Sequence, residues 1–187
     1  MRKIGKRIAL IIFILLPIII ISGILLSKEI KKSLYPIRYE EYVVKYSDEY
    51  EVPKDLIYAV IYSESHFNEE AYSSAGAMGL MQIMPDTFTW LTGHIGENYG
   101  SEDIYNPEIN IRLGVYYLSY LYRRFESWDT AIAGYNAGHG NVTNWLADTR
   151  YSEDGKTLKY IPIGQTRGYV VKVNKVRDIY TELYFSD

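Results

Sequence analysis

Hydrophobic and polar positions recur with a helical period over most of the chain beyond residue 38. Convincing runs of alternating strand-like positions are absent from the sequence, so a mainly α-helical domain is expected over 39–187. A small hairpin in the glycine-rich or polar loops is the one possible exception, and 149–159 is expected to be a flexible loop. The predicted helices cover 39–51, 53 to about 64, 85–91, 106–125, 129–136, 141–147 and 166–184.

The N-terminal segment has a different pattern. An uncharged apolar run, 8–26, follows four basic residues, and at ~1.5 Å per residue it nearly spans a hydrocarbon layer of ~30 Å. The run lacks a signal-peptidase site, so we expect an uncleaved single-pass membrane helix over 8–26, after a cytoplasmic basic tail, 1–7, and before a juxtamembrane linker, 27–38. Leading basic charge predicts that the domain lies on the extracytoplasmic side of the cell membrane, which protease accessibility on intact cells would check.

Composition narrows the function classes. Without the four leading basic residues, 16 basic and 23 acidic residues remain, a net charge of −7 that gives no electrostatic reason to bind nucleic acid. The absence of cysteine excludes disulfides, thiol catalysis and cysteine metal sites, and the three histidines show no ligand spacing, so no metal site is expected. Tyrosine, with 20 residues, offers flat faces suited to sugars, although most of these rings are expected to fill the edge of a helical core.

Glu64 is the main candidate for chemistry. Leu56, Val60 and Glu64 follow at four-residue steps, so Glu64 continues an apolar stripe and is predicted to face the core. A loop of small residues up to Pro85 follows, and such a loop lets another molecule come close. From periodicity alone, a helix-end carboxylate that hydrogen-bonds to this loop is the preferred interpretation. The alternative is a buried acid with a raised pKa that protonates a leaving oxygen.

A second carboxylate would be expected beside a glycosidase acid, because most glycoside-cleaving sites use two. Glu69, Glu70 and Asp86 are near Glu64 in sequence, but no pattern fixes any of them opposite it. The residues alone therefore indicate a site with one good carboxylate.

Three sequence blocks, in order, resemble the SLT-type lytic transglycosylases, which have a goose-lysozyme-like fold. The resemblance covers the chain from about residue 50 to its C-terminus, and the first block is the most specific. The blocks are Glu64-Ser65-x-Phe67-Asn68 with Ala71-x-Ser73-x-Ala75-Gly76-Ala77-x-Gly79-Leu80-Met81-Gln82-x-Met84-Pro85, then Ala133-Gly134-Tyr135-Asn136-Ala137-Gly138, then Ile161-Pro162 through Thr166-Arg167-x-Tyr169-Val170-x-Lys172-Val173.

The resemblance implies an enzyme that cleaves the β-1,4 bond between N-acetylmuramic acid and N-acetylglucosamine in peptidoglycan glycan strands, without a cofactor. Glu64 matches the family's single glutamate, which protonates the glycosidic oxygen and then deprotonates the muramic C6 hydroxyl to close a 1,6-anhydro ring. The substrate's N-acetyl group is thought to stabilise the cationic centre, so a second carboxylate is not needed.

The same resemblance implies the substrate-binding residues. Ser73 and Gln82 match positions that line the saccharide groove, Tyr135 matches a tyrosine near the catalytic acid, and Asn136 is its neighbour in the groove. Tyr169 matches a further groove position. For Tyr135, core packing is the alternative interpretation.

Two positions depart from the family pattern. Glu69 stands where the family usually has proline, which affects a turn. Gln165 stands where the third block usually has glutamate, so any contribution of that carboxylate is absent or supplied elsewhere. Two alternatives to the transglycosylase stay open, a hydrolytic muramidase and a non-catalytic wall-binding scaffold of an envelope machine, and Gln165 is the feature that favours the scaffold.

Overall fold

A computed structural model of the protein describes residues 23 and 26–186. Residues 26–34 are helical, and 27–34 of these lie in the part expected to be a linker. The predicted membrane helix over 8–26 lies, apart from Gly23 and Leu26, outside the described residues. No helix among the described residues combines the length and the apolar character needed to cross a membrane.

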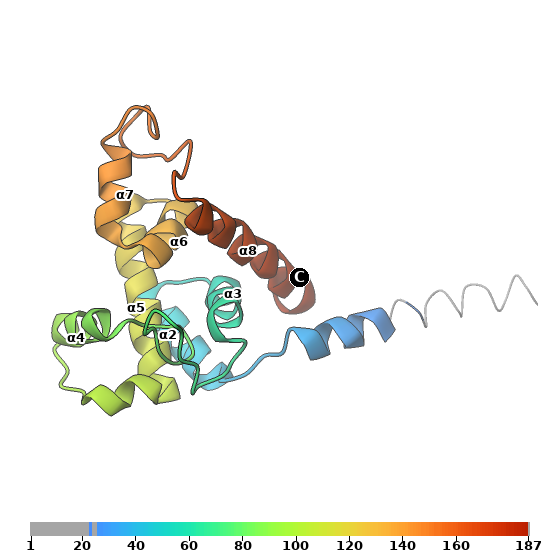
Figure 1. Ribbon diagram of the computed structural model, residues 1–187. Helices are drawn as coiled ribbons and strands as arrows, with labels where there is room; N and C mark the ends of the chain where they lie inside the picture. The colour runs from blue at the N-terminus through green and yellow to red at the C-terminus, as the bar shows by residue number, and fades with distance from the viewer. Residues whose placement is uncertain (1–22, 24–25, 187) are drawn as a thin grey trace, which may run out of the picture. The chain divides into compact units, whose positions relative to one another are not determined.

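Residues 37–185 form a compact helical unit. Figure 1 shows it as an assembly of helices, with α5 running through the middle of the elements labelled α2, α4 and α6. Its elements are α2 (Glu40–Tyr50), α3 (Lys54–Ser65), α4 (Pro85–His94), the 3₁₀ helix η1 (Ser101–Tyr105), α5 (Pro107–Phe125), α6 (Trp128–Ala137), α7 (His139–Leu146), α8 (Gly164–Tyr180) and the π-helical turn η2 (Thr181–Phe185).

The core is built around α5 and α3. α5 packs against α2, α4 and α6, while α8 crosses back to pack against both α3 and α6. The apolar stripes expected from periodicity are buried, since Leu56 and Val60 of α3 and Ile111 and Leu118 of α5 are fully inaccessible. Val173 of α8 is also 0% exposed. The mainly helical architecture is therefore confirmed.

Several boundaries differ from the prediction. α7 begins at His139 rather than Asn141, because Gly138, at φ 83°, turns the chain directly from α6 into α7. α4 extends to His94, and α8 begins at Gly164. Within the described residues the expected hairpin is reduced to two isolated bridges, Tyr72 to Met78 and Met78 to Ile83.

The polar segment 149–159 has no regular structure but contains specific turns. The Asp154 carboxylate accepts hydrogen bonds from the backbone N–H groups of Lys156, at 2.8 Å, and Thr157, at 2.7 Å. The Lys159 N–H donates to the Tyr151 carbonyl at 2.9 Å. These bonds give the segment a defined path.

The small-residue loop, which joins α3 to α4 over residues 66–84, is fixed to α5 by one buried side chain. Asn110, 0% exposed, accepts from the Met81 N–H at 2.7 Å and donates to the Ile104 carbonyl at 2.7 Å and the Met78 carbonyl at 3.2 Å. Gly79, at φ 77°, lies so close that a Cβ there would collide with the Asn110 amide. Polar contacts therefore position the loop, together with the packing of its buried Leu80 and Met81 side chains.

Replacing Asn110 with alanine is expected to destabilise the domain. The change leaves the Met81 N–H and the Ile104 carbonyl without their partner in a buried place, at a cost of about 2 to 4 kcal/mol. Chemical denaturation of the parent and Asn110→Ala measures this loss of unfolding free energy. Asn144→Ala, at an exposed asparagine of α7, is the matched control and is expected to be neutral. Equal stability of Asn110→Ala and Asn144→Ala would contradict the assignment.

Candidate active site

Glu64 lies in the last turn of α3, where the helix meets the small-residue loop. The helix ends at Ser65, and His66 and Phe67 both adopt left-handed backbone angles, φ 52° and 63°, which turn the chain away. The Ser65 hydroxyl donates to the Leu80 carbonyl at 2.7 Å and so joins the helix end to the loop. Glu64 is half-buried, as the apolar stripe predicted.

Burial controls the acidity of Glu64. Desolvation raises the pKa of its carboxyl group to about 7, although a hydrogen bond from Tyr169 and the charge of Lys172 both act in the opposite direction. The group is therefore balanced between its acid and its carboxylate near neutral pH, which is the condition for one residue to act first as an acid and then as a base.

Both groups that favour the carboxylate come from α8. The Tyr169 hydroxyl donates to Glu64 Oε1 at 2.5 Å. Lys172, three residues further along the same helix face, donates from Nζ to the Ser63 carbonyl at 2.7 Å. The contact with Tyr169 agrees with its predicted place at the site. Lys172 had no role in the sequence prediction, although its spacing from Tyr169 on the expected helix could have indicated one.

Tyr135 of α6 lies near enough to Glu64 to feel its charge. Burial is the main cause that raises the pKa of Tyr135 well above its usual range, and the negative charge of Glu64 adds to the effect. Its hydroxyl donates to the Met81 carbonyl at 2.8 Å. Tyr135 therefore packs near Glu64 and holds the small-residue loop.

Three predicted site residues share one cavity. Gln82, Tyr135 and Asn136 lie among the lining of a hollow of about 260 Å³. Gln82 has a left-handed backbone, φ 49°, and its amide donates to the Ala71 and Gly79 carbonyls, at 3.0 Å each. The Asn136 side-chain oxygen accepts from the Thr166 hydroxyl at 2.9 Å. The side-chain carbonyl oxygen of Gln82 and the side-chain NH2 group of Asn136 stay available to a ligand.

The other residues singled out in the sequence, Ser73, Gln165 and Glu69, do not line this cavity. Ser73 belongs to the same loop, but its hydroxyl accepts the Ala77 N–H at 2.9 Å and so stabilises the loop's own turn. Gln165 is exposed in the first turn of α8, four residues before Tyr169. Glu69 is exposed and accepts from the Tyr39 hydroxyl at 2.9 Å. Two positioning residues had no predicted role: Asn110 had no sequence signal beyond its place in a helix, and Thr166 was only a member of the third sequence block.

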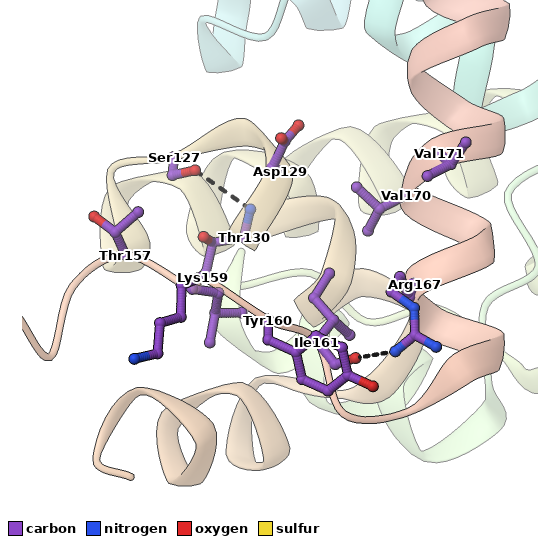
Figure 2. Close-up of a pocket in the computed structure, with 11 residues that line it drawn as sticks. Ser127, Asp129, Thr130, Thr157, Lys159, Tyr160, Ile161, Arg167, Val170 and Val171 are labelled. Atoms are coloured by element: carbon purple, nitrogen blue, oxygen red, sulfur yellow. Dashed lines mark hydrogen bonds between the residues drawn. The ribbon is translucent and has the colours of Figure 1, made fainter. Parts of the chain in front are cut away.

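A separate cavity of about 270 Å³ lies between α6, α8 and the segment 157–161. Figure 2 shows Arg167 at one end of it, beside Tyr160 and donating to the Ile161 carbonyl at 2.7 Å. Val171 also lines the cavity, and it lies about 200° around α8 from Tyr169. The cavity therefore faces away from Glu64 and is not part of the candidate active site.

Comparison with known sequences identifies the family. The family profile described as Transglycosylase SLT domain matches residues 41–158. The chain belongs to this family. The match covers the end of α3, the loop and the Tyr135 block, so the family resemblance of these residues is confirmed.

Curated relatives and solved structures agree with this family. The SLT chain is 34% identical over 157 residues to the soluble lytic murein transglycosylase of Escherichia coli K12, covering 82% of this chain and 24% of that protein. It resembles the crystal structure of the 70 kDa soluble lytic transglycosylase of Escherichia coli, with a TM-score of 0.73 and 30% identity, covering 84% of this chain and 26% of the other. An inactive glutamate-to-glutamine mutant of Slt from Pseudomonas aeruginosa is similar, with a TM-score of 0.69 and 32% identity over 79% and 24% of the two chains.

The lysozyme-like helical fold expected for an SLT domain is thus confirmed. The chain spans about a quarter of the length of these relatives. The similarity concerns the SLT part of those longer proteins.

The raised pKa of Glu64 makes a prediction about stability. The pKa of Glu64 is about 7 in the folded protein and 4.5 in the unfolded chain, so the folded state favours the protonated carboxyl. The contribution of Glu64 to the free energy of unfolding is therefore fully present below pH 4.5 and is lost as the pH rises through 7. Glu64→Gln keeps the shape without the ionisation. We expect equal unfolding free energies for parent and variant at pH 4, and a variant more stable by about 2 kcal/mol at pH 8. Chemical denaturation at both pH values measures the difference, and a parent as stable as the variant at pH 8 would contradict a buried Glu64.

Proposed function

We propose that this SLT protein is a peptidoglycan lytic transglycosylase with Glu64 as its catalytic acid and base. The bond cleaved is the β-1,4 bond between N-acetylmuramic acid and N-acetylglucosamine, and the product carries a 1,6-anhydromuramic end. The observation that carries the proposal is the half-buried Glu64 carboxyl, with a pKa of about 7 and a 2.5 Å hydrogen bond from Tyr169. The names of the relatives, which are lytic murein transglycosylases, support the substrate class.

In the first step, protonated Glu64 gives its proton to the glycosidic oxygen. The electron pair of the bond between the muramic C1 and that oxygen moves to the oxygen, which leaves as the 4-hydroxyl of N-acetylglucosamine. The substrate's own N-acetyl oxygen stabilises the positive charge at C1. The Tyr169 hydroxyl and the Lys172 ammonium group both favour the carboxylate that Glu64 becomes, so they assist its loss of the proton.

In the second step, the Glu64 carboxylate takes the proton of the muramic C6 hydroxyl. The C6 oxygen attacks C1 and closes the 1,6-anhydro ring, so Glu64 ends protonated and no water is consumed. One carboxyl group with a pKa near the working pH suits both steps. This single-group chemistry is consistent with a site in which sequence analysis found no second carboxylate opposite Glu64.

The cavity beside Tyr135 provides the proposed contacts with the glycan strand. Gln82 and Asn136 present an amide oxygen and amide hydrogens to the N-acetyl and hydroxyl groups of the sugars. We further propose, from the basic leader and the apolar run over 8–26, that the domain works at the outer face of the cell membrane.

Product analysis tests the reaction. Mass spectrometry of purified peptidoglycan after digestion by the full chain should show 1,6-anhydromuramic products, each lighter by one water than a reducing-end product. Digestion in heavy-oxygen water should leave these products unlabelled. Labelled reducing ends would show a hydrolytic muramidase instead, and an intact parent protein without any cleavage would indicate a wall-binding scaffold.

Glu64→Gln should lower the rate of product formation about a hundred-fold or more, because the variant cannot transfer the proton. Its matched control is Glu70→Gln, at an exposed carboxylate six residues away, which should cleave like the parent. The rate should also fall as the pH rises above about 7, since the first step needs the protonated form of Glu64. Equal losses in the two variants would contradict the assignment of the acid.

A further inference from the structure

We propose that five aromatic side chains on α4, α5 and α7 form a second saccharide subsite that extends the groove beyond the cavity at Tyr135. They are Trp90, His94, Tyr117, Tyr120 and His139, called the aromatic wall below. Its ligand would be a further amino-sugar residue of the same glycan strand. This inference rests on the proposed function, because it names how the strand continues after leaving Glu64.

The cavity beside Tyr135 leads toward the wall. Tyr117 lines the cavity, and its ring centroid lies 5.3 Å from that of Tyr135. On the opposite rims, Thr87 of α4 and Gly138 of the α6–α7 junction also line it. The wall thus begins where the cavity ends, and Tyr117 belongs to both.

Both rims of the cavity continue into wall residues. Thr87, Trp90 and His94 follow at intervals of three and four along α4, so they lie on one face of that helix. His139 directly follows Gly138 in the chain. The ring of Trp90 stacks on that of His139, with centroids 6.0 Å apart and an interplanar angle of 25°. The two rims therefore meet in one continuous aromatic surface.

The wall is only partly used for core packing. Tyr117, 8% exposed, is its buried base. Trp90, Tyr120 and His139 are half-buried and His94 is exposed, so these rings keep surface open to solvent. Two ring contacts hold Trp90 in place, an edge-to-face contact with Tyr120 at 5.2 Å between centroids and a tilted contact with His94 at 4.4 Å and 51°. A rigid, partly exposed aromatic surface loses little entropy when a ligand covers it.

The chemistry of these rings fits a sugar. The C–H face of a pyranose packs on a flat aromatic ring, while the indole N–H, the phenol and the imidazole nitrogens can hydrogen-bond to ring substituents at the edge. The surface is uncharged apart from the imidazoles, which suits neutral N-acetylated sugars. The same wall would have little affinity for a short ligand that fills only the cavity beside Tyr135.

Binding measurements with strands of different length test the wall. The full chain carrying Glu64→Gln is titrated by calorimetry with glycan oligosaccharides of increasing length, so that binding is measured without cleavage. Affinity should rise with the length of the oligosaccharide until the strand is long enough to cover the aromatic wall. Adding Trp90→Ala should remove the last increase in affinity with length and weaken the binding of long strands roughly three- to tenfold. His139→Ala, from the other rim, should have the same effect.

Trp128→Ala is the matched control, because Trp128 also stacks on an exposed tyrosine, Tyr122, with centroids 4.0 Å apart, but lies at the start of α6. It should keep the full dependence on length. Thermal unfolding shows whether each variant is folded, and His139→Ala decides the question if Trp90→Ala does not fold.

The outcomes separate the two proposals. A parent that releases anhydromuramic products while folded wall variants bind long strands like the Trp128 control would overturn the wall and leave the proposed function standing. A parent that neither binds nor cleaves any strand would overturn both.

Discussion

The desolvation of one carboxyl group, that of Glu64, is the constraint on which the rest of the site depends. Burial raises its pKa to about 7, and the site contains two groups that limit this rise, the Tyr169 hydroxyl and the Lys172 ammonium. Without burial, Glu64 would be a carboxylate at neutral pH and could not donate a proton. Without the two groups from α8, the pKa of Glu64 would be higher, and in the proposed reaction the acid would release its proton less readily. The contact between α3 and α8 therefore influences the acidity of Glu64 as well as the packing of the two helices.

The small-residue loop after α3 is held in place by hydrogen bonds as well as by its buried Leu80 and Met81 side chains. It is rich in glycine, alanine and serine, so its backbone polar groups must find partners. Asn110 supplies partners for Met78 and Met81, and the Tyr135 hydroxyl supplies one for the Met81 carbonyl. Elements from the middle of the chain, α5 and α6, thus fix a loop that closes over the end of α3.

Sequence reasoning predicted the helical elements and the inward direction of Glu64 because both follow from a local period, as Leu56 and Val60 show. It also identified Tyr169, through a family motif. It failed where the decisive contact joins distant segments. The hydrogen bond from the Met81 N–H to Asn110 and that from Thr166 to Asn136 depend on how distant segments meet, which no local pattern encodes. The sequence also did not indicate that the Ser73 hydroxyl accepts a hydrogen bond within the loop's own turn.

Gln165 is the departure from the family pattern that most favours a site without catalysis, and the geometry reduces its weight. The residue is exposed in the first turn of α8, where water screens any charge, whereas Tyr169, one turn further on, bonds directly to Glu64. A glutamate at 165 would add negative charge on the same helix face and favour the protonated form of Glu64, but burial already does this. The neutral side chain at this exposed position therefore changes the acidity of Glu64 little.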